Sequence, residues 1–132
     1  MTLVASCHCG ATRIALPSHP AEAKSCNCSY CTRTGAVWAY YRPGELVFLS
    51  QEGEADYAPS GMNHHHFCLH CGMQTWGDSP DWASLYNNDG SSKTGDSNAM
   101  PTERVYAVNL NLIDDLDWAQ VAIEKVDGRT SW

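Results

Sequence analysis

All seven cysteines of this 132-residue chain fall into three short clusters, and these clusters are the residues best able to do chemistry. The clusters are Cys7-x-Cys9, Cys26-x-Cys28-x-x-Cys31 and Cys68-x-x-Cys71. Zinc prefers thiolate and imidazole ligands, taking four protein ligands in structural sites and three in catalytic sites, where the fourth position is exchangeable. Because the three clusters hold two, three and two cysteines, two of them together can supply the four ligands of one closed zinc site. The three-cysteine cluster then predicts a second site that is one ligand short.

The first and last clusters are suited to form one site together. In each, a glycine follows the second cysteine, Gly10 after Cys9 and Gly72 after Cys71. Glycine adopts the positive φ with which a tight turn rejoins a strand, so each turn can present two thiolates to one ion. A zinc ion bound by both turns would link the N-terminal segment to the middle of the chain, and metal binding would then contribute directly to folding.

The central cluster places three thiolates within six residues, a spacing that suits a loop running into a first helical turn. Three protein ligands leave one position for water or for the sulfur of a substrate, and zinc deprotonates a thiol that it binds. The alternative is a fourth protein ligand, which would make this a second structural site. The histidines that could supply it are His19, His64 and His66.

Two further features near the cysteines are candidates for function. Arg33 follows the third cysteine of the central cluster by two residues, and a guanidinium beside an open zinc site can hold a substrate carboxylate through two hydrogen bonds. The opposing interpretation is a solvated surface arginine. In the run His64-His65-His66, a strand would place the outer two on one face and His65 on the other. Because the cysteines suffice as ligands, we expect these histidines to be polar surface residues or to contact the residues that bind the metal.

Short strands must position these residues. Segments rich in β-branched and aromatic residues, separated by Pro or Gly, predict strands at 11–16, 36–41, 46–50, 55–58, 64–67, 73–76, 105–110 and 121–126. No window keeps a 3.6-residue apolar period for three turns, so we expect little helix, with short candidates after Cys28 and at 114–119. Residues 78–102, rich in Ser, Asn, Asp and Gly, predict a long loop. The predicted fold class is mainly β.

The length of the chain limits the number of domains, and its net charge limits the classes of binding partner. At 132 residues the chain is expected to form a single domain over residues 1–132. A net charge of −7 and the absence of basic runs argue against binding nucleic acid or an anionic membrane surface. Neither a signal-peptide pattern nor an apolar stretch of about 20 residues is present, so we expect a cytoplasmic location with no membrane span. There cysteines persist as thiols or metal ligands, and seven cannot all pair within one chain.

The three cysteine motifs together resemble the glutathione-dependent formaldehyde-activating enzyme and centromere protein V family. The matching residues, in order over about 5 to 118, are Ser6-Cys7-His8-Cys9-Gly10, Cys26-Asn27-Cys28-Ser29-Tyr30-Cys31, Gly35, Phe67-Cys68-Leu69-His70-Cys71-Gly72, Val108-Asn109-Leu110 and Leu116-Asp117. The resemblance implies a β-tent fold of packed antiparallel sheets stapled by zinc. It also implies a structural zinc held by Cys7, Cys9, Cys68 and Cys71, and a second, catalytic-type zinc held by Cys26, Cys28 and Cys31.

The activity that the resemblance implies is that of a carbon–sulfur lyase acting on a small thiol, in which formaldehyde condenses with glutathione to S-hydroxymethylglutathione. Two positions depart from the family pattern: Thr32 stands where a basic residue is common, and Met73 where a small hydroxyl residue is usual. The cysteines alone do not carry specificity for glutathione. Two other interpretations are a zinc-stabilised binding module without catalysis, and a sensor whose zinc thiolates release metal on oxidation.

Both the enzyme and the binding-module interpretations predict about two zinc ions per chain, because the ligand count supports two sites. Elemental analysis of the purified protein checks this number. A value near one is expected if the three-cysteine site loses its ion during purification, whereas no metal together with oxidised cysteines contradicts the prediction.

Overall fold

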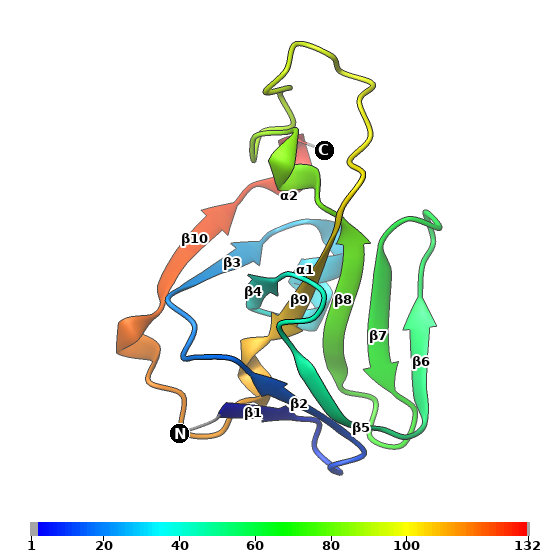
Figure 1. Cartoon of the computed structure of the whole chain (residues 1–132), viewed down its shortest axis with the longest axis vertical. Coiled ribbons are helices and arrows are strands. Elements are labelled where there is room, and N and C mark those ends of the chain that lie inside the picture. Colours follow the sequence, from blue (N-terminus) through cyan, green and yellow to red (C-terminus); the bar gives the residue numbers. More distant parts are fainter. Residues whose placement is uncertain (1–2, 132) are drawn as a thin grey trace.

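The computed structural model describes residues 3–131 and forms two β-sheets. The smaller sheet has the order β1-β2-β5, with β1 at Leu3–Ser6, β2 at Thr12–Leu16 and β5 at Val47–Gln51. The larger sheet has the order β10-β3-β4-β9-β8-β7-β6. Its strands are β3 (Glu22–Cys26), β4 (Trp38–Tyr41), β6 (Glu54–Tyr57), β7 (His64–Cys68), β8 (Gln74–Pro80), β9 (Arg104–Asn109) and β10 (Ala122–Val126). In Figure 1 the smaller sheet lies at the lower end of the larger one.

Helix is scarce in the described residues, and the predicted mainly β class is confirmed. The α-helices are α1 (Ser29–Thr34), directly after Cys28 as expected, and α2 (Gly128–Ser131). Single 3₁₀ turns lie at Trp82–Ser84, Leu110–Leu112 and Trp118–Gln120. None of the helices described is both long and apolar enough to cross a bilayer.

The structure differs from the sequence expectations at several places, and strand β1 and helix α2 are elements that the sequence does not predict. The helix candidate at 114–119 is a turn and a 3₁₀ segment, because the side chain of Asp117 accepts a hydrogen bond from Ala119 N and Asp115 has a φ of 60°. Strand β3, with the sequence EAKSC, carries no strand signal. It pairs with β10 in parallel, unlike the antiparallel arrangement that the family resemblance implies. Strand β8 continues to Pro80 because it pairs with β9, so it enters the segment predicted as a loop.

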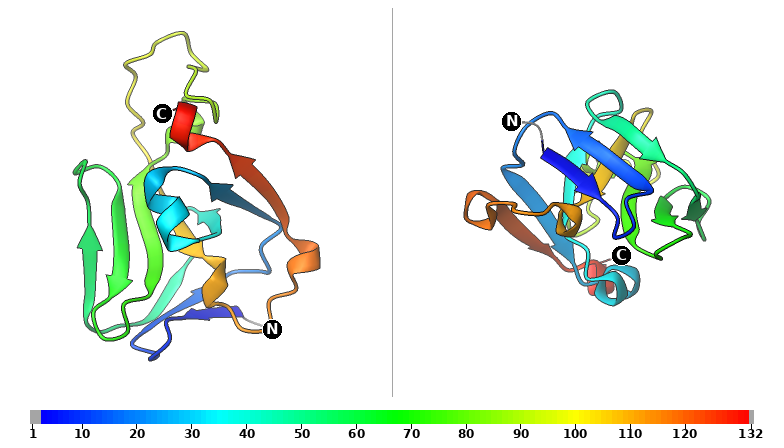
Figure 2. Two further views of the ribbon diagram at one scale, coloured as in Figure 1. Left: turned by 180° about the vertical axis from the view of Figure 1, so that it is seen from behind. Right: turned by 90° about the horizontal axis from the view of Figure 1, so that it is seen from below.

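The core lies between the two sheets. It is built from apolar side chains of both sheets and of the segment after β9, among them Ile14, Leu16, Ala39, Trp76, Val108 and Leu110. Figure 2, seen from below, shows β1 and β2 lying across this end of the larger sheet. The turns that end these strands therefore meet at one edge of the core, where two of the cysteine clusters lie.

Substitution of Leu110 tests whether this residue packs in the core. Its side chain has no exposed surface, and its N–H donates to Val37 O at 2.8 Å. We expect Leu110→Ala to lower the free energy of unfolding by about 2–5 kcal/mol, because the cavity is enclosed on all sides. The matched control is Leu49→Ala, since Leu49 is 51% exposed. Equal midpoints of urea unfolding for the two variants would contradict the assignment.

Candidate metal centres

Four cysteines from two distant turns converge at the junction of the sheets. Cys7 and Cys9 lie in the β1–β2 connection, Cys68 ends β7, and Cys71 lies in the turn leading to β8. Their Sγ atoms all lie within 4.8 Å of one another, with Cys7 to Cys9 at 3.7 Å and Cys9 to Cys68 at 3.6 Å. A tetrahedral site with Zn–S bonds of about 2.3 Å has S···S edges of about 3.8 Å. The four sulfurs therefore fit a zinc ion.

Glycines and backbone hydrogen bonds shape both turns of this first cluster. Gly10 and Gly72 have φ values of 84° and 75°, and a Cβ at either position would meet no atom within 4 Å. The requirement for glycine is thus conformational rather than steric, as the sequence predicts. Thr12 N donates to Cys7 Sγ at 3.2 Å, and Gly72 N donates to Cys68 O at 2.8 Å. These bonds hold the sulfurs toward one point.

The pKa values of the thiols in this first cluster are shifted in opposite directions. Burial opposes ionisation of Cys71, but backbone hydrogen bonds from Cys9 and Met73 lower the pKa of its thiol to about 6. At Cys9, a backbone hydrogen bond from Ala11 lowers the pKa, but burial and the neighbouring thiols outweigh it and raise the pKa to about 11. The cluster therefore keeps part of its protons unless a positive charge compensates the thiolates.

The second cluster gathers the three central cysteines at the start of α1. Cys26 ends β3, Cys28 is the N-cap of α1, and Cys31 lies within the helix. Their Sγ atoms lie within 4.8 Å of one another. Cys28 N donates to Cys26 Sγ at 3.4 Å, and Cys31 N donates to Cys28 Sγ at 3.3 Å. The first helical turn thus directs its N–H groups at sulfurs, an arrangement that suits thiolates.

No fourth ligand atom from histidine or a carboxylate joins the three sulfurs within this distance in the part of the chain that the structure describes. The three histidines considered as ligands have other partners. His19 Nδ1 lies 2.9 Å from Pro20 O, His64 Nδ1 lies 2.6 Å from Asp56 Oδ2, and His66 Nδ1 lies 3.8 Å from Glu54 Oε2. The second cluster is therefore a set of three thiols. Burial raises the pKa of Cys31 to about 12, and burial also raises the pKa of Cys26.

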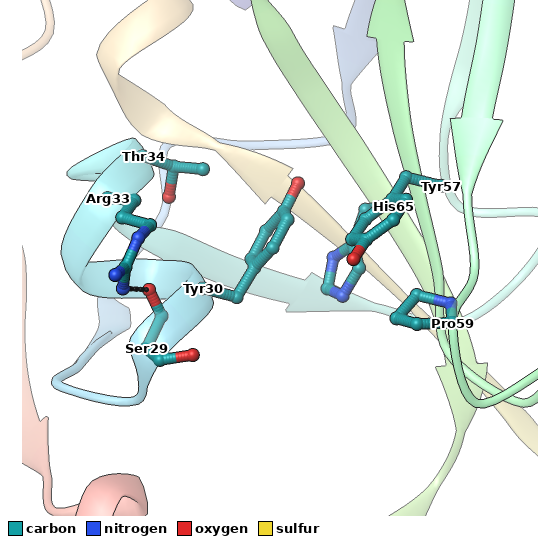
Figure 3. Close-up of a pocket in the computed structure, with 7 residues that line it drawn as sticks. All are labelled: Ser29, Tyr30, Arg33, Thr34, Tyr57, Pro59 and His65. Atoms are coloured by element: carbon teal, nitrogen blue, oxygen red, sulfur yellow. Dashed lines mark hydrogen bonds between the residues drawn. The ribbon is translucent and has the colours of Figure 1, made fainter.

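A pocket of about 450 Å³ lies between α1 and the β6–β7 hairpin. It is lined by Ser29, Tyr30, Arg33, Thr34, Tyr57, Pro59 and His65 (Figure 3). The predicted substrate-binding residue Arg33 is exposed and lies in this lining. The lining also includes Tyr30, Tyr57 and His65, which are not among the site residues predicted from the sequence. The alternation along β7 does separate His65 from its neighbours, but only the folded structure places it opposite α1.

Comparisons with known proteins agree over most of the chain. Residues 2–109 match the family model described as "Glutathione-dependent formaldehyde-activating enzyme". A Halomonas elongata protein named "Putative glutathione-dependent formaldehyde-activating enzyme" is 31% identical over 138 residues, covering 96% of this chain and 85% of that protein. A crystal structure of a Rhodobacter sphaeroides protein aligns with a TM-score of 0.61 and 26% identity, covering 92% of this chain and 99% of that one. Together with the three cysteine motifs, these matches show that the chain belongs to the glutathione-dependent formaldehyde-activating enzyme family.

Proposed function

We propose that this protein is a zinc-dependent carbon–sulfur lyase acting on the adduct of formaldehyde with a thiol such as glutathione. The observation that carries the proposal is the second cluster, in which three thiols converge without a fourth ligand from the described residues. A closed structural site takes four protein ligands, whereas three leave a position for substrate. Membership of the family and the name of the Halomonas relative support the choice of thiol and aldehyde.

The two clusters would have separate roles. Cys7, Cys9, Cys68 and Cys71 would hold a structural zinc that joins the sheets, and Cys26, Cys28 and Cys31 would hold the second zinc. All seven cysteines are free thiols, a state that suits a reducing compartment such as the cytoplasm. Residues 1–132 would act as a single zinc-binding domain.

The reaction needs an ionised sulfur and a proton for oxygen. In the forward direction the thiol loses its proton, its sulfur bonds to the carbonyl carbon of formaldehyde, and the carbonyl oxygen gains a proton; the reverse breaks the same carbon–sulfur bond, and no oxidation occurs. Zinc bound at the second cluster would supply stabilisation of the thiolate form. The chain's own part is to orient the metal ligands, which the N–H groups of Cys28 and Cys31 do through their bonds to sulfur.

The division of labour between the clusters is testable with one substitution in each. We expect Cys28→Ser to lower the metal content from about two ions to about one and to leave the melting temperature nearly unchanged, because Cys28 lies beside the surface helix α1. We expect Cys68→Ser to lower the melting temperature strongly, because Cys68 is fully buried and binding at the first cluster is coupled to folding. Elemental analysis and thermal unfolding by circular dichroism measure both effects. Unfolding of the Cys28→Ser protein would argue against separate roles.

The activity itself is measurable without a coupled assay. In ¹³C NMR exchange spectroscopy with ¹³C-formaldehyde and glutathione, we expect the wild-type protein to accelerate exchange between hydrated formaldehyde and the adduct. Cys28→Ser should return exchange to the uncatalysed rate, because the second site loses one of its three ligands. A control is Ser97→Ala, which changes an exposed serine that belongs to neither cysteine cluster and does not line the pocket. Exchange that is unaffected by wild-type protein would instead favour a binding module stabilised by two zinc ions.

A further inference from the structure

The pocket between α1 and the β6–β7 hairpin is lined by residues that belong to neither cysteine cluster. One wall is aromatic. The Tyr30 ring stacks on His65 with centroids 3.9 Å apart and an interplanar angle of 22°, and Tyr57 follows at 6.1 Å from Tyr30. Figure 3 shows the Tyr30 ring extending from α1 between Arg33, on the same helix, and the rings of His65 and Tyr57. The volume of about 450 Å³ lies in the range of small-molecule sites.

Hydrogen bonds to Gln74 fix the position of the Tyr30 ring. The Tyr30 hydroxyl donates a hydrogen bond to Gln74 Oε1. Gln74 Nε2 in turn donates to His66 O at 2.9 Å, so the ring that extends from α1 is tied to both β8 and β7. A surface whose side chains are already fixed loses little entropy when a ligand packs against it. The wall therefore presents a ready flat surface to an apolar or planar group.

Arg33 is the charged group of the pocket. Its Nη1 donates to Ser29 O at 2.9 Å, and within the described residues it has no carboxylate partner at ion-pair distance. The lining contains no Asp or Glu, although the chain as a whole carries a net charge of −7. Burial, and then the neighbouring His66 and His64, lower the pKa of His65, so the imidazole is uncharged near neutral pH. The pocket thus offers one fixed positive charge beside an uncharged aromatic wall.

We propose that this pocket binds the carboxylate-bearing part of the thiol substrate, with Arg33 holding one carboxylate and the Tyr30–His65 pair packing against the adjoining peptide or apolar portion. This inference rests on the proposed function, because it takes the ligand to be the thiol that reacts. Ser29 and Tyr30 lie between Cys28 and Cys31 in the same helix, whose pitch is about 5.4 Å per turn. A thiol anchored here is therefore close to the second cluster. Thiols without a carboxylate, such as 2-mercaptoethanol, lack the group that Arg33 would bind.

The test uses S-methylglutathione and the zinc-loaded protein, because blocking the sulfur removes any contribution from metal–thiolate bonding. Isothermal titration calorimetry should show saturable binding to the wild-type protein. We expect Arg33→Gln to weaken binding about tenfold or more, since charge-assisted hydrogen bonds to a carboxylate are lost. Arg33→Lys should restore part of the affinity. The matched control is Arg42→Gln, which removes an exposed arginine outside the pocket and should leave binding unchanged.

A second pair of measurements separates the parts of the site. His65→Ala should weaken binding of S-methylglutathione by several fold, because one ring of the stack is lost. The diethyl ester of S-methylglutathione, which has no free carboxylate, should bind Arg33→Gln and wild-type protein equally weakly.

The outcomes distinguish this inference from the lyase proposal. If Arg33→Gln and Arg42→Gln bind S-methylglutathione alike, or if the ester binds as tightly as the acid, the pocket is not the carboxylate site, whatever the protein catalyses. If binding depends on Arg33 but the protein does not accelerate formaldehyde exchange, the carboxylate site stands and the lyase proposal fails.

Discussion

The meeting of two cysteine turns at the junction of the sheets is the constraint on which the rest of the structure depends. One turn joins β1 to β2 and the other joins β7 to β8, and their four sulfurs lie within 4.8 Å of one another. Four thiolates this close repel one another unless a cation lies between them. A divalent ion bound there would convert the repulsion into a link between the sheets, so that the ends of four strands are fixed at one point.

Gln74 connects this point to the second cluster. It begins β8, shortly after the turn that carries Cys71, and its side chain bonds to the Tyr30 hydroxyl on one side and to His66 O on the other. Tyr30 lies between Cys28 and Cys31, so the same hydrogen bond that fixes the aromatic ring also ties α1 to the larger sheet. Through Gln74, the helix that carries the second cluster is thereby bonded to the strand that follows the first cluster, although the two clusters share no residue.

The sequence predicted features that depend on local chemistry and missed those that depend on packing. The glycine-containing turns after Cys9 and Cys71 and the helix after Cys28 follow from residue type and spacing, and the structure has all three. Strand β3 was not predictable from its composition, because it becomes a strand only through β10 on one side and β4 on the other. The pocket was not predictable from the sequence either, because it forms between residues about 30 positions apart that no sequence period relates.

The run His64-His65-His66 lies on β7, the strand that ends at Cys68. Successive side chains of β7 alternate between faces: His66 stacks on Trp76 at 3.9 Å, while His65 stacks on Tyr30 at 3.9 Å on the other side. If the register of β7 shifted by one residue, its two faces would be exchanged. His64 and His66, which lie beside carboxylates of β6, would then face the pocket in place of His65. Cys68 ends the same strand, and its sulfur is confined to the four-sulfur cluster. The register in which β7 pairs with β6 therefore brings the Cys68 sulfur into the four-sulfur cluster and places His65 in the pocket at the same time.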